Sequence, residues 1–304
     1  MTARNAVAFL LAAAALIAPF VISDFWVFVL IEACIFSLYA AAFNLLLGYG
    51  GMIAFGFAAF FGIGAYTLAV LLKKADFNVV AAAALSPVMT AFCGAIVGYL
   101  CARRVGIYLG MLTFSFQMLA YAVVLKWYDL TGGDDGLSGL TFSGPLGTPR
   151  GFYFLTLAIV TVSLFLLRRL VESPFGAALK AQRSNDAKSK AIGINTDLVR
   201  WLAFIISAFF AGLAGTLFAL ANQSVFPDWL NWTSSAIPIV MTILGGMHSF
   251  IGPIVGAGIY VLLQTVLTGM TEYWALILGL IIIALVVALP DGVMSLFRKE
   301  GRNG

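Results

Sequence analysis

The sequence contains few charged residues for its length: Asp, Glu, Lys and Arg together account for 10% of its 304 residues, against about 25% in an ordinary soluble domain. Hydrophobic residues account for 62%. A globule of this size cannot hide that much apolar surface, because it still exposes about a quarter of what its unfolded chain exposes. The composition excludes a soluble enzyme, a disordered chain and a nucleic-acid-binding domain, and it predicts a polytopic membrane protein.

Residues that carry redox, metal or nucleotide chemistry are also scarce. Cys34, Cys93 and Cys101 lie in or at the ends of apolar runs, so they are predicted to be small core residues without disulfides. The single histidine, His248, lies in a Gly-rich turn and is interpreted as a structural polar residue. No lysine follows a glycine, so the chain lacks the Gly-x-x-x-x-Gly-Lys-Ser/Thr loop that binds ATP phosphates. We therefore expect no enzyme activity, metal or cofactor in this chain.

Apolar runs of about 20 residues, the length that crosses the hydrocarbon layer as a helix, recur along the whole sequence. The predicted fold is a single all-α domain over 1–304, a polytopic membrane helix bundle of about ten transmembrane helices. The ten predicted spans are 6–22, 25–47, 52–72, 79–100, 105–127, 152–169, 201–221, 236–250, 254–270 and 273–289. We expect the first to remain as a helix instead of being cleaved as a signal peptide. Glycines and a proline between 245 and 253 predict that one piece of 236–289 is broken or re-entrant.

Basic residues divide unevenly between the two sides of this predicted bundle. With ten spans and a cytoplasmic N-terminus, thirteen of the 17 Lys and Arg residues fall on the cytoplasmic side. This asymmetry follows the positive-inside rule and predicts that both termini are cytoplasmic. The external basic residues are then Lys73, Lys74, Lys126 and Arg150, and the external acids are Asp24, Asp76, Asp129, Asp134, Asp135, Asp228 and Glu272.

Two connections are long enough to have a structure of their own, the external loop 128–151 and the cytoplasmic loop 170–200. The cytoplasmic loop starts a helix at Ser173-Pro174, an N-cap followed by proline at the first helical position. Ser184 or Asn185 can cap a second short helix, which Gly193 is placed to end. The apolar face of the first helix comprises Phe175, Ala178, Leu179 and Gln182. Such helices either lie on the lipid surface or dock a cytosolic partner, and composition leaves both open.

Several Gly-rich or polar segments are spread over residues 44–253: the stretches 44–51 and 58–66, Thr131-Gly-Gly-Asp-Asp-Gly-Leu-Ser-Gly139, the loop 172–194, the stretch 203–215 and Leu244-Gly-Gly-Met-His-Ser-Phe-Ile-Gly-Pro253. Together they resemble the branched-chain amino-acid ABC transporter permease family (LivH/LivM-type), with the LivM branch the better fit. One departure stands at 54–57, where the family pattern often reads Ser-Leu-Gly-His and this chain has Ala54-Phe55-Gly56-Phe57. That departure bears on which substrate is carried.

The resemblance implies a permease subunit of an ATP-driven ABC importer in the bacterial cytoplasmic (inner) membrane, for branched-chain or other hydrophobic amino acids. It implies partners: cytosolic ATP-binding subunits that hold ATP and Mg, a second permease subunit (a homo- or heterodimer) and a periplasmic substrate-binding protein, besides membrane lipid. Loop 170–200 then becomes the coupling loop to the ATPase, with Phe175, Leu179 and Ile192 as apolar contacts flanked by Lys180 and Arg183. The coupling-loop residues are Ser173, Pro174, Phe175, Gly176, Ala178, Leu179, Lys180, Arg183, Ile192 and Gly193.

The predicted translocation pathway follows a small or polar stripe on the span 105–127, which includes Gly110, Thr113, Gln117 and Tyr121. A stripe of this kind either lines a passage or packs closely against another helix. Asn44, Gly51 and Phe57 in the first Gly-rich region complete the predicted pathway. In the external loop, Asp134 and Asp135 are predicted to contact the binding protein, or else belong to a Gly/Asp turn without a partner.

An ion-coupled secondary transporter that works without an ATPase is the alternative. Such a transporter needs a titratable site within the membrane. Glu32 is the only acid inside a predicted span. A single acid without an obvious partner makes a poor proton relay, so the ATP-driven importer is the preferred interpretation.

Overall fold

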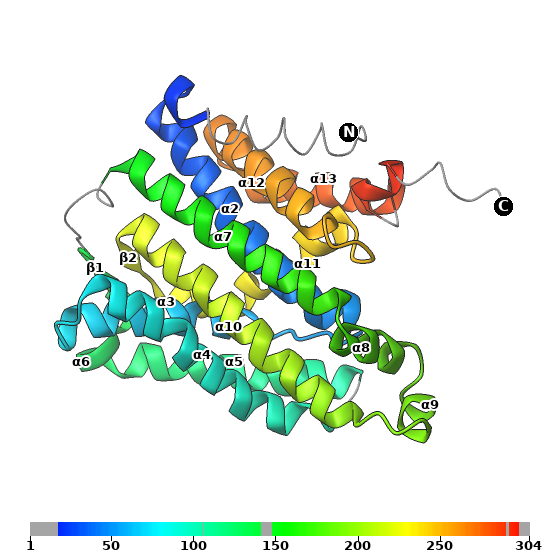
Figure 1. Ribbon diagram of the computed structural model, residues 1–304. Helices are drawn as coiled ribbons and strands as arrows, with labels where there is room; N and C mark the ends of the chain where they lie inside the picture. The colour runs from blue at the N-terminus through cyan, green and yellow to red at the C-terminus, as the bar shows by residue number, and fades with distance from the viewer. Residues whose placement is uncertain (1–17, 105, 141–147, 290–291, 298–304) are drawn as a thin grey trace.

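The computed structural model describes residues 18–104, 106–140, 148–289 and 292–297. They form a bundle of helices whose long axes run roughly together, with two short helices, α8 and α9, at one end and the short elements α6, β1 and β2 at the other (Figure 1). The elements are α2 (Asp24–Asn44), the π-helical turn η1 (Leu45–Tyr49), α3 (Ala58–Lys74), α4 (Val79–Cys101), α5 (Ile107–Lys126), α6 (Tyr128–Thr131), η2 (Gly133–Asp135), β1 (Leu137–Ser138), α7 (Pro149–Glu172), α8 (Pro174–Ser184), α9 (Asp186–Ala191), α10 (Thr196–Asn222), β2 (Ser224–Val225), η4 (Pro227–Leu230), α11 (Trp232–Gly245), α12 (Gly252–Met270), α13 (Trp274–Ala288) and η5 (Val293–Phe297).

Seven helical segments of the described residues are long and apolar enough to cross a membrane, which confirms an all-α membrane bundle. Two further apolar helices are shorter: α3 has 17 residues and α11 has 14. Each predicted span from 25 onward overlaps one of these nine helices, whereas most of the first predicted span, 6–22, lies outside the described residues. The total of about ten spans and the side on which the termini lie stay predictions.

Helix α10 lies at the centre of the bundle and packs against α2, α3 and α4. The contact between α10 and α3 depends on glycine, because a Cβ at Gly215 would overlap the carbonyl of Phe61 and one at Gly64 would overlap the backbone of Gly212. Small residues at a crossing let two backbones approach closely, which is how apolar helices gain contact area in a membrane. An aromatic cluster surrounds this crossing on the α2 side, with Phe61 stacked on Phe36.

Two helices start inside the bundle instead of at its ends. Residues 50–57 are not helical, so α3 begins six residues later than the predicted span at 52. The first predicted piece of 236–289 is the short helix α11, which begins at Trp232 and ends at Gly245; the turn 246–251 follows it. After the C-terminal end of α10, β2 pairs with β1 in an antiparallel contact that matches Leu137 with Val225.

We expect Gly215→Ala to weaken the bundle by about 1–3 kcal/mol, because the added methyl group overpacks the contact with Phe61. The matched control is Gly279→Ala, since nothing lies within 4 Å of a Cβ built at Gly279. Alanine is the better helix former by about 1 kcal/mol, so the control should keep or raise the unfolding temperature. Thermal unfolding of the two purified variants in detergent tests this, and equal unfolding temperatures would show that the crossing is not tightly packed.

Candidate functional site

The loop between α7 and α10 folds into two short helices, as the sequence predicts. Ser173 is extended and Pro174 is the first residue of α8, although the Ser173 hydroxyl donates to the carbonyl of Leu170, 2.6 Å away, instead of capping α8. Asn185 caps α9 by accepting the N–H of Lys188 at 2.9 Å. Gly193 has φ +88°, the left-handed conformation expected after the end of that helix. Both helices lie at one end of the bundle (Figure 1).

The predicted apolar stripe of α8 faces the rest of the chain. Leu179 is fully buried and approaches Gly50, while Phe175 and Ala178 are half-buried. Gly176 is buried where a Cβ would overlap the carbonyl of Val171. The stripe therefore fastens α8 to its own bundle, which leaves Ile192, 75% exposed, as the apolar side chain of the predicted contacts that faces outward. A docking role for this loop stays a prediction.

Charged side chains hold the second half of the loop in place. Arg200, in the first turns of α10, is buried; its guanidinium lies 2.6 Å from the Asp186 carboxylate and 3.8 Å from that of Asp197. It also donates to the carbonyl of Ala102. Burial alone would raise the pKa of Asp186, but the hydrogen bond from Lys190 and the charge of Arg200 outweigh it and hold that pKa below its usual range. Asp186 is therefore ionised at neutral pH and anchors α9 to α10.

Lys180 and Arg183 point from α8 toward the end of η1. The Lys180 ammonium lies 5.2 Å from the centre of the Tyr49 ring, a cation–π contact. The Arg183 guanidinium donates to the carbonyl of Gly48 and lies 3.4 Å from Nε2 of His248. His248, interpreted as a structural residue, is thus exposed at the same end of the bundle as α8.

The polar stripe on α5 is buried in helix contacts in this conformation. Gln117 is fully buried and its amide makes three hydrogen bonds: Nε2 donates to the carbonyls of Leu230 (3.0 Å) and Asn231 (2.9 Å), and Oε1 accepts from the Ser235 hydroxyl (2.9 Å). Ser235 in turn accepts the N–H of Ala58 at 3.0 Å. The first N–H of α3 and the last carbonyls before α11 are thus satisfied by side chains at the level of the middle of α5.

Thr113 and Gly110 face residues 50–57. Thr113 Oγ1 accepts the N–H of Gly56 at 3.4 Å and donates to the carbonyls of its own helix. Gly110 is buried where a Cβ would meet the Phe55 ring. Of the two roles left open for this stripe, the structure shows close packing. A role in translocation stays a prediction, and it requires the contact between α5 and residues 50–57 to open.

The remaining predicted pathway residues lie at different places around the contact between α5 and residues 50–57. Phe57 is fully buried, with its ring 5.1 Å from that of Phe43 and 5.4 Å from that of Tyr39. Asn44 is buried at the end of α2 and Gly51 is exposed beyond η1, while Tyr121 is half-buried. The structure therefore brings Thr113 and Gln117 to the start of α3, but places Asn44 beside the turn 246–251 and Gly51 beside Arg183 of α8.

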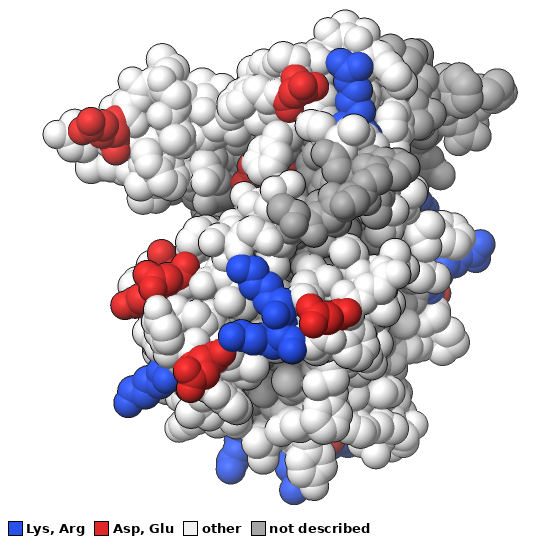
Figure 2. All heavy atoms as spheres, turned by 90° about the vertical axis from the view of Figure 1, so that its left-hand side faces the viewer, with Lys and Arg blue, Asp and Glu red and all other residues white. Residues whose placement is uncertain are grey.

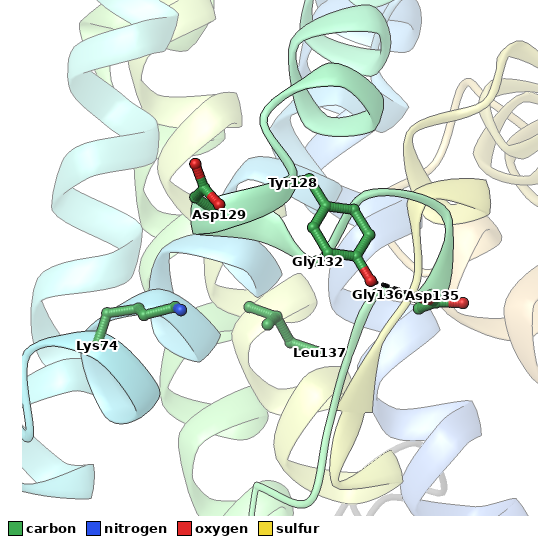
Figure 3. A pocket seen from close by; sticks show the side chains of 7 residues that line it. All are labelled: Lys74, Tyr128, Asp129, Gly132, Asp135, Gly136 and Leu137. Carbon is green, nitrogen blue, oxygen red and sulfur yellow. Dashed lines mark hydrogen bonds between the residues drawn. The ribbon is translucent and has the colours of Figure 1, made fainter.

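The opposite end of the bundle carries acidic and basic side chains side by side (Figure 2). There Lys74 and Leu137 border a shallow hollow, which is also lined by Asp129 and by Tyr128 (Figure 3). Tyr128 donates its hydroxyl to Asp135, 3.1 Å away, and this hydrogen bond raises the tyrosine pKa. Asp134 and Asp135 are both exposed in η2. A contact with a binding protein at these residues stays a prediction.

The alternative interpretation depends on Glu32. Glu32 is half-buried on α2, and no basic partner for it is found among the described residues. Within the described part of the chain, no three His, Cys, Asp or Glu residues are grouped so that they could hold a metal ion.

Three structural residues could not be identified from the sequence pattern: Ser235, Arg200 and Asn231. Ser235 lies in a run that reads as a loop before an apolar span, and its partner is 118 positions away. Arg200 reads as one more cytoplasmic charge, and only its burial distinguishes it. Asn231 contributes its backbone carbonyl, which accepts from Gln117 Nε2, and no residue pattern in the sequence marks that carbonyl.

We expect Gln117→Leu to destabilise the folded protein by about 2–4 kcal/mol, because it removes the acceptor of the buried Ser235 O–H and the donor to the Leu230 and Asn231 carbonyls. The matched control is Gln264→Leu on α12, which removes a half-buried glutamine with no side-chain hydrogen bond among the described residues. Denaturation in detergent compares the two variants. If both lose the same stability, the network around Gln117 is not what holds α3 and α11 together.

We expect Asp186→Asn to cost about 1–2 kcal/mol at neutral pH, because Arg200 stays buried with a weaker partner. The Asp186 side chain is 35% exposed, which keeps this below the cost for a fully buried pair. Because the folded-state pKa of Asp186 is depressed, its contribution to stability is fully present above the ordinary carboxyl value of 3.8. That contribution is lost as the pH falls through the lower folded-state pKa. The stability gap between wild type and variant should therefore be constant from pH 5 upward and close at acidic pH; a gap independent of acid would contradict this.

Comparison with known proteins identifies the family of the chain. Residues 25–286 match the family described as branched-chain amino acid transport system / permease component. The chain is 29% identical, over 93% of its length and 73% of theirs, to the high-affinity branched-chain amino acid transport system permease proteins LivM of Salmonella typhimurium and Escherichia coli. It is 27% identical to the autoinducer 2 import system permease protein LsrC of Photorhabdus laumondii, over 55% of this chain and 50% of that one. No solved structure matches it. The chain belongs to the branched-chain amino acid transport permease family.

Proposed function

We propose that this chain is the membrane-spanning permease subunit of an ATP-driven ABC importer for branched-chain or other hydrophobic amino acids. The observation that carries the proposal is the α8–α9 loop, two short helices packed against one end of a membrane bundle of this family, the second of them capped by Asn185. Nucleotide chemistry takes place in separate cytosolic subunits, which hold ATP and Mg, because this chain has no phosphate-binding loop.

The α8–α9 end of the bundle faces the cytoplasm in this proposal, and the protein lies in the bacterial inner membrane with about ten spans and both termini inside. Charge supports this orientation. Nine described basic residues gather at that end: Arg103, Arg104, Arg168, Arg169, Lys180, Arg183, Lys188, Lys190 and Arg200. The positive-inside rule places such a group on the cytoplasmic side. The mixed charges of the other end (Figure 2) then face the periplasm.

Three kinds of partner complete the importer. ATP-binding subunits dock on α8 and α9, and a second permease subunit, identical or similar, completes the membrane domain. A periplasmic binding protein delivers the amino acid at the end where Asp134 and Asp135 are exposed. The relatives named LivM belong to high-affinity branched-chain amino acid systems, which supports this substrate class.

Transport in proteoliposomes tests the proposal. The chain is purified together with the subunits that accompany it and is reconstituted into proteoliposomes. Uptake of radiolabelled leucine is then measured in the presence of the binding protein, with and without ATP on the side of the membrane that the ATP-binding subunits face. We expect uptake that requires ATP and a co-purified ATPase. Uptake driven by a proton or sodium gradient alone would overturn the proposal in favour of an ion-coupled transporter, in which Glu32→Gln should then abolish transport.

We expect Ile192→Glu to lower ATP-driven uptake about tenfold or more, since a charge at an exposed apolar contact is costly to bury in an interface. Ile192 is a better probe than the predicted contact Leu179, which is fully buried and whose replacement would disturb the fold. Ile107→Glu is the matched control, because Ile107 is 67% exposed and opens α5, where an acid suits the helix dipole. Wild-type uptake by the Ile192 variant would remove the loop from the docking surface.

A further inference from the structure

Arg183 joins α8 to two bends of the bundle that are far apart in the sequence. The first bend, Gly48–Gly51, ends the turn η1 that prolongs α2; the second bend, 246–251, connects α11 to α12. The guanidinium of Arg183 donates through Nη1 to the carbonyl of Gly48 in the first bend. Its Nη2 lies 3.4 Å from Nε2 of His248 in the second bend. One side chain of the loop thus contacts both bends.

Both bends follow helix C-termini, where backbone carbonyls lack helical partners and the helix dipole is negative. A guanidinium suits this position, because it is permanently charged and has five N–H donors in a flat fork. Among the described basic residues, Lys180 is the other one that reaches η1, and it meets the Tyr49 ring instead of a carbonyl. Arg183 therefore places its positive charge at the negative C-terminal end of η1, where it donates to the Gly48 carbonyl.

The two bends are built to lie against each other and against Arg183. Asn44 Nδ2 donates to the carbonyl of Ser249 at 3.4 Å, and a Cβ at Gly48 would overlap the carbonyl of Met247. Gly51, with φ +66°, leaves the space through which the aliphatic part of Arg183 passes, since a Cβ there would lie 2.7 Å from its Cγ. Replacing either glycine with a larger residue would separate parts that now touch.

Each bend adjoins one of the two helices that start inside the bundle: the first bend precedes α3 and the second follows α11. The first bend continues into residues 52–57, which lead to the start of α3 and in which the Gly56 N–H donates to the Thr113 hydroxyl. The second bend ends α11, whose first turn holds Ser235, and Ser235 accepts the N–H of Ala58 at the start of α3. A displacement of α8 would therefore reach the contact between α3, α5 and α11 along two routes that both begin at Arg183.

Resting on the proposed function, we infer that Arg183 is the positioning residue that transmits movement of α8, imposed by the ATPase, to both bends and so to the buried contact around Gln117. It acts through the Gly48 carbonyl and His248 and does not touch ATP or the transported amino acid. Lysine cannot replace it, because one ammonium on a flexible chain does not hold both bends at once.

The test compares Arg183→Gln and Arg183→Lys with wild type in proteoliposomes that contain the full complex and the binding protein. The measured quantity is the number of leucine molecules taken up per ATP hydrolysed. Arg104→Gln is the matched control, since Arg104 is an exposed arginine at the same end with no side-chain partner among the described residues. We expect both Arg183 variants to hydrolyse ATP at a rate within about twofold of wild type while leucine per ATP falls about tenfold, the loss expected for one charge-assisted hydrogen bond.

A second measurement on the full-length chain in detergent decides the matter if the Arg183 variants assemble poorly. Amide hydrogen exchange in 48–52 and 246–251 should be faster in both variants than in wild type, and unchanged in Arg104→Gln. Leucine per ATP at the wild-type value, or exchange unchanged in either bend, would overturn the inference. If wild-type uptake itself needs no ATP, the proposed function fails; if only the variant behaviour differs from expectation, the role of Arg183 alone fails.

Discussion

The structure depends on how it satisfies backbone groups where helices begin inside an apolar bundle. Away from water, an unpaired N–H or carbonyl costs several kcal/mol, and a helix has four such groups at each end. Here the start of α3 and the approach to α11 meet at the middle of α5, and the Gln117 amide with the Ser235 hydroxyl supplies the missing partners. Those two side chains pair the Ala58 N–H at the start of α3 and the Leu230 and Asn231 carbonyls that precede α11.

The contact between α3, α5 and α11 is easier to separate than the contact between α10 and α3. Long helices such as α10 have every central backbone group bonded internally and are tightly packed through glycine contacts with α3. The junction of α3, α5 and α11 is instead held by a few side-chain hydrogen bonds, each worth about 1 kcal/mol net. In the proposed importer, we therefore expect a conformational change that opens a passage to break this junction before it separates α10 from α3.

The sequence carried enough information for the fold class and for most of the spans, because apolar runs and the separation of charges are additive signals along the chain. The two helices of the loop were also predictable, since Ser173-Pro174 and Gly193 act through local geometry. The late start of α3 at Ala58 and the partners of Gln117 were not, because they depend on contacts between residues more than one hundred positions apart. The stripe on α5 was visible as a pattern, but a pattern of small and polar residues does not say whether it packs or lines a passage.

In the α8–α9 loop too, the sequence pattern predicted which residues are apolar but not which surface they contact. Its apolar stripe was predicted at the right positions, yet Leu179 turned out to be fully buried against its own bundle. In the proposed importer, α8 has to contact the ATP-binding subunit and also stay attached to its own bundle. Its buried apolar face and Arg183 provide that attachment, so Ile192 and the exposed face of α8 are left for the proposed contact. A subunit that pushed on α8 would displace it together with both bends, because α8 contacts them through Leu179 and Arg183.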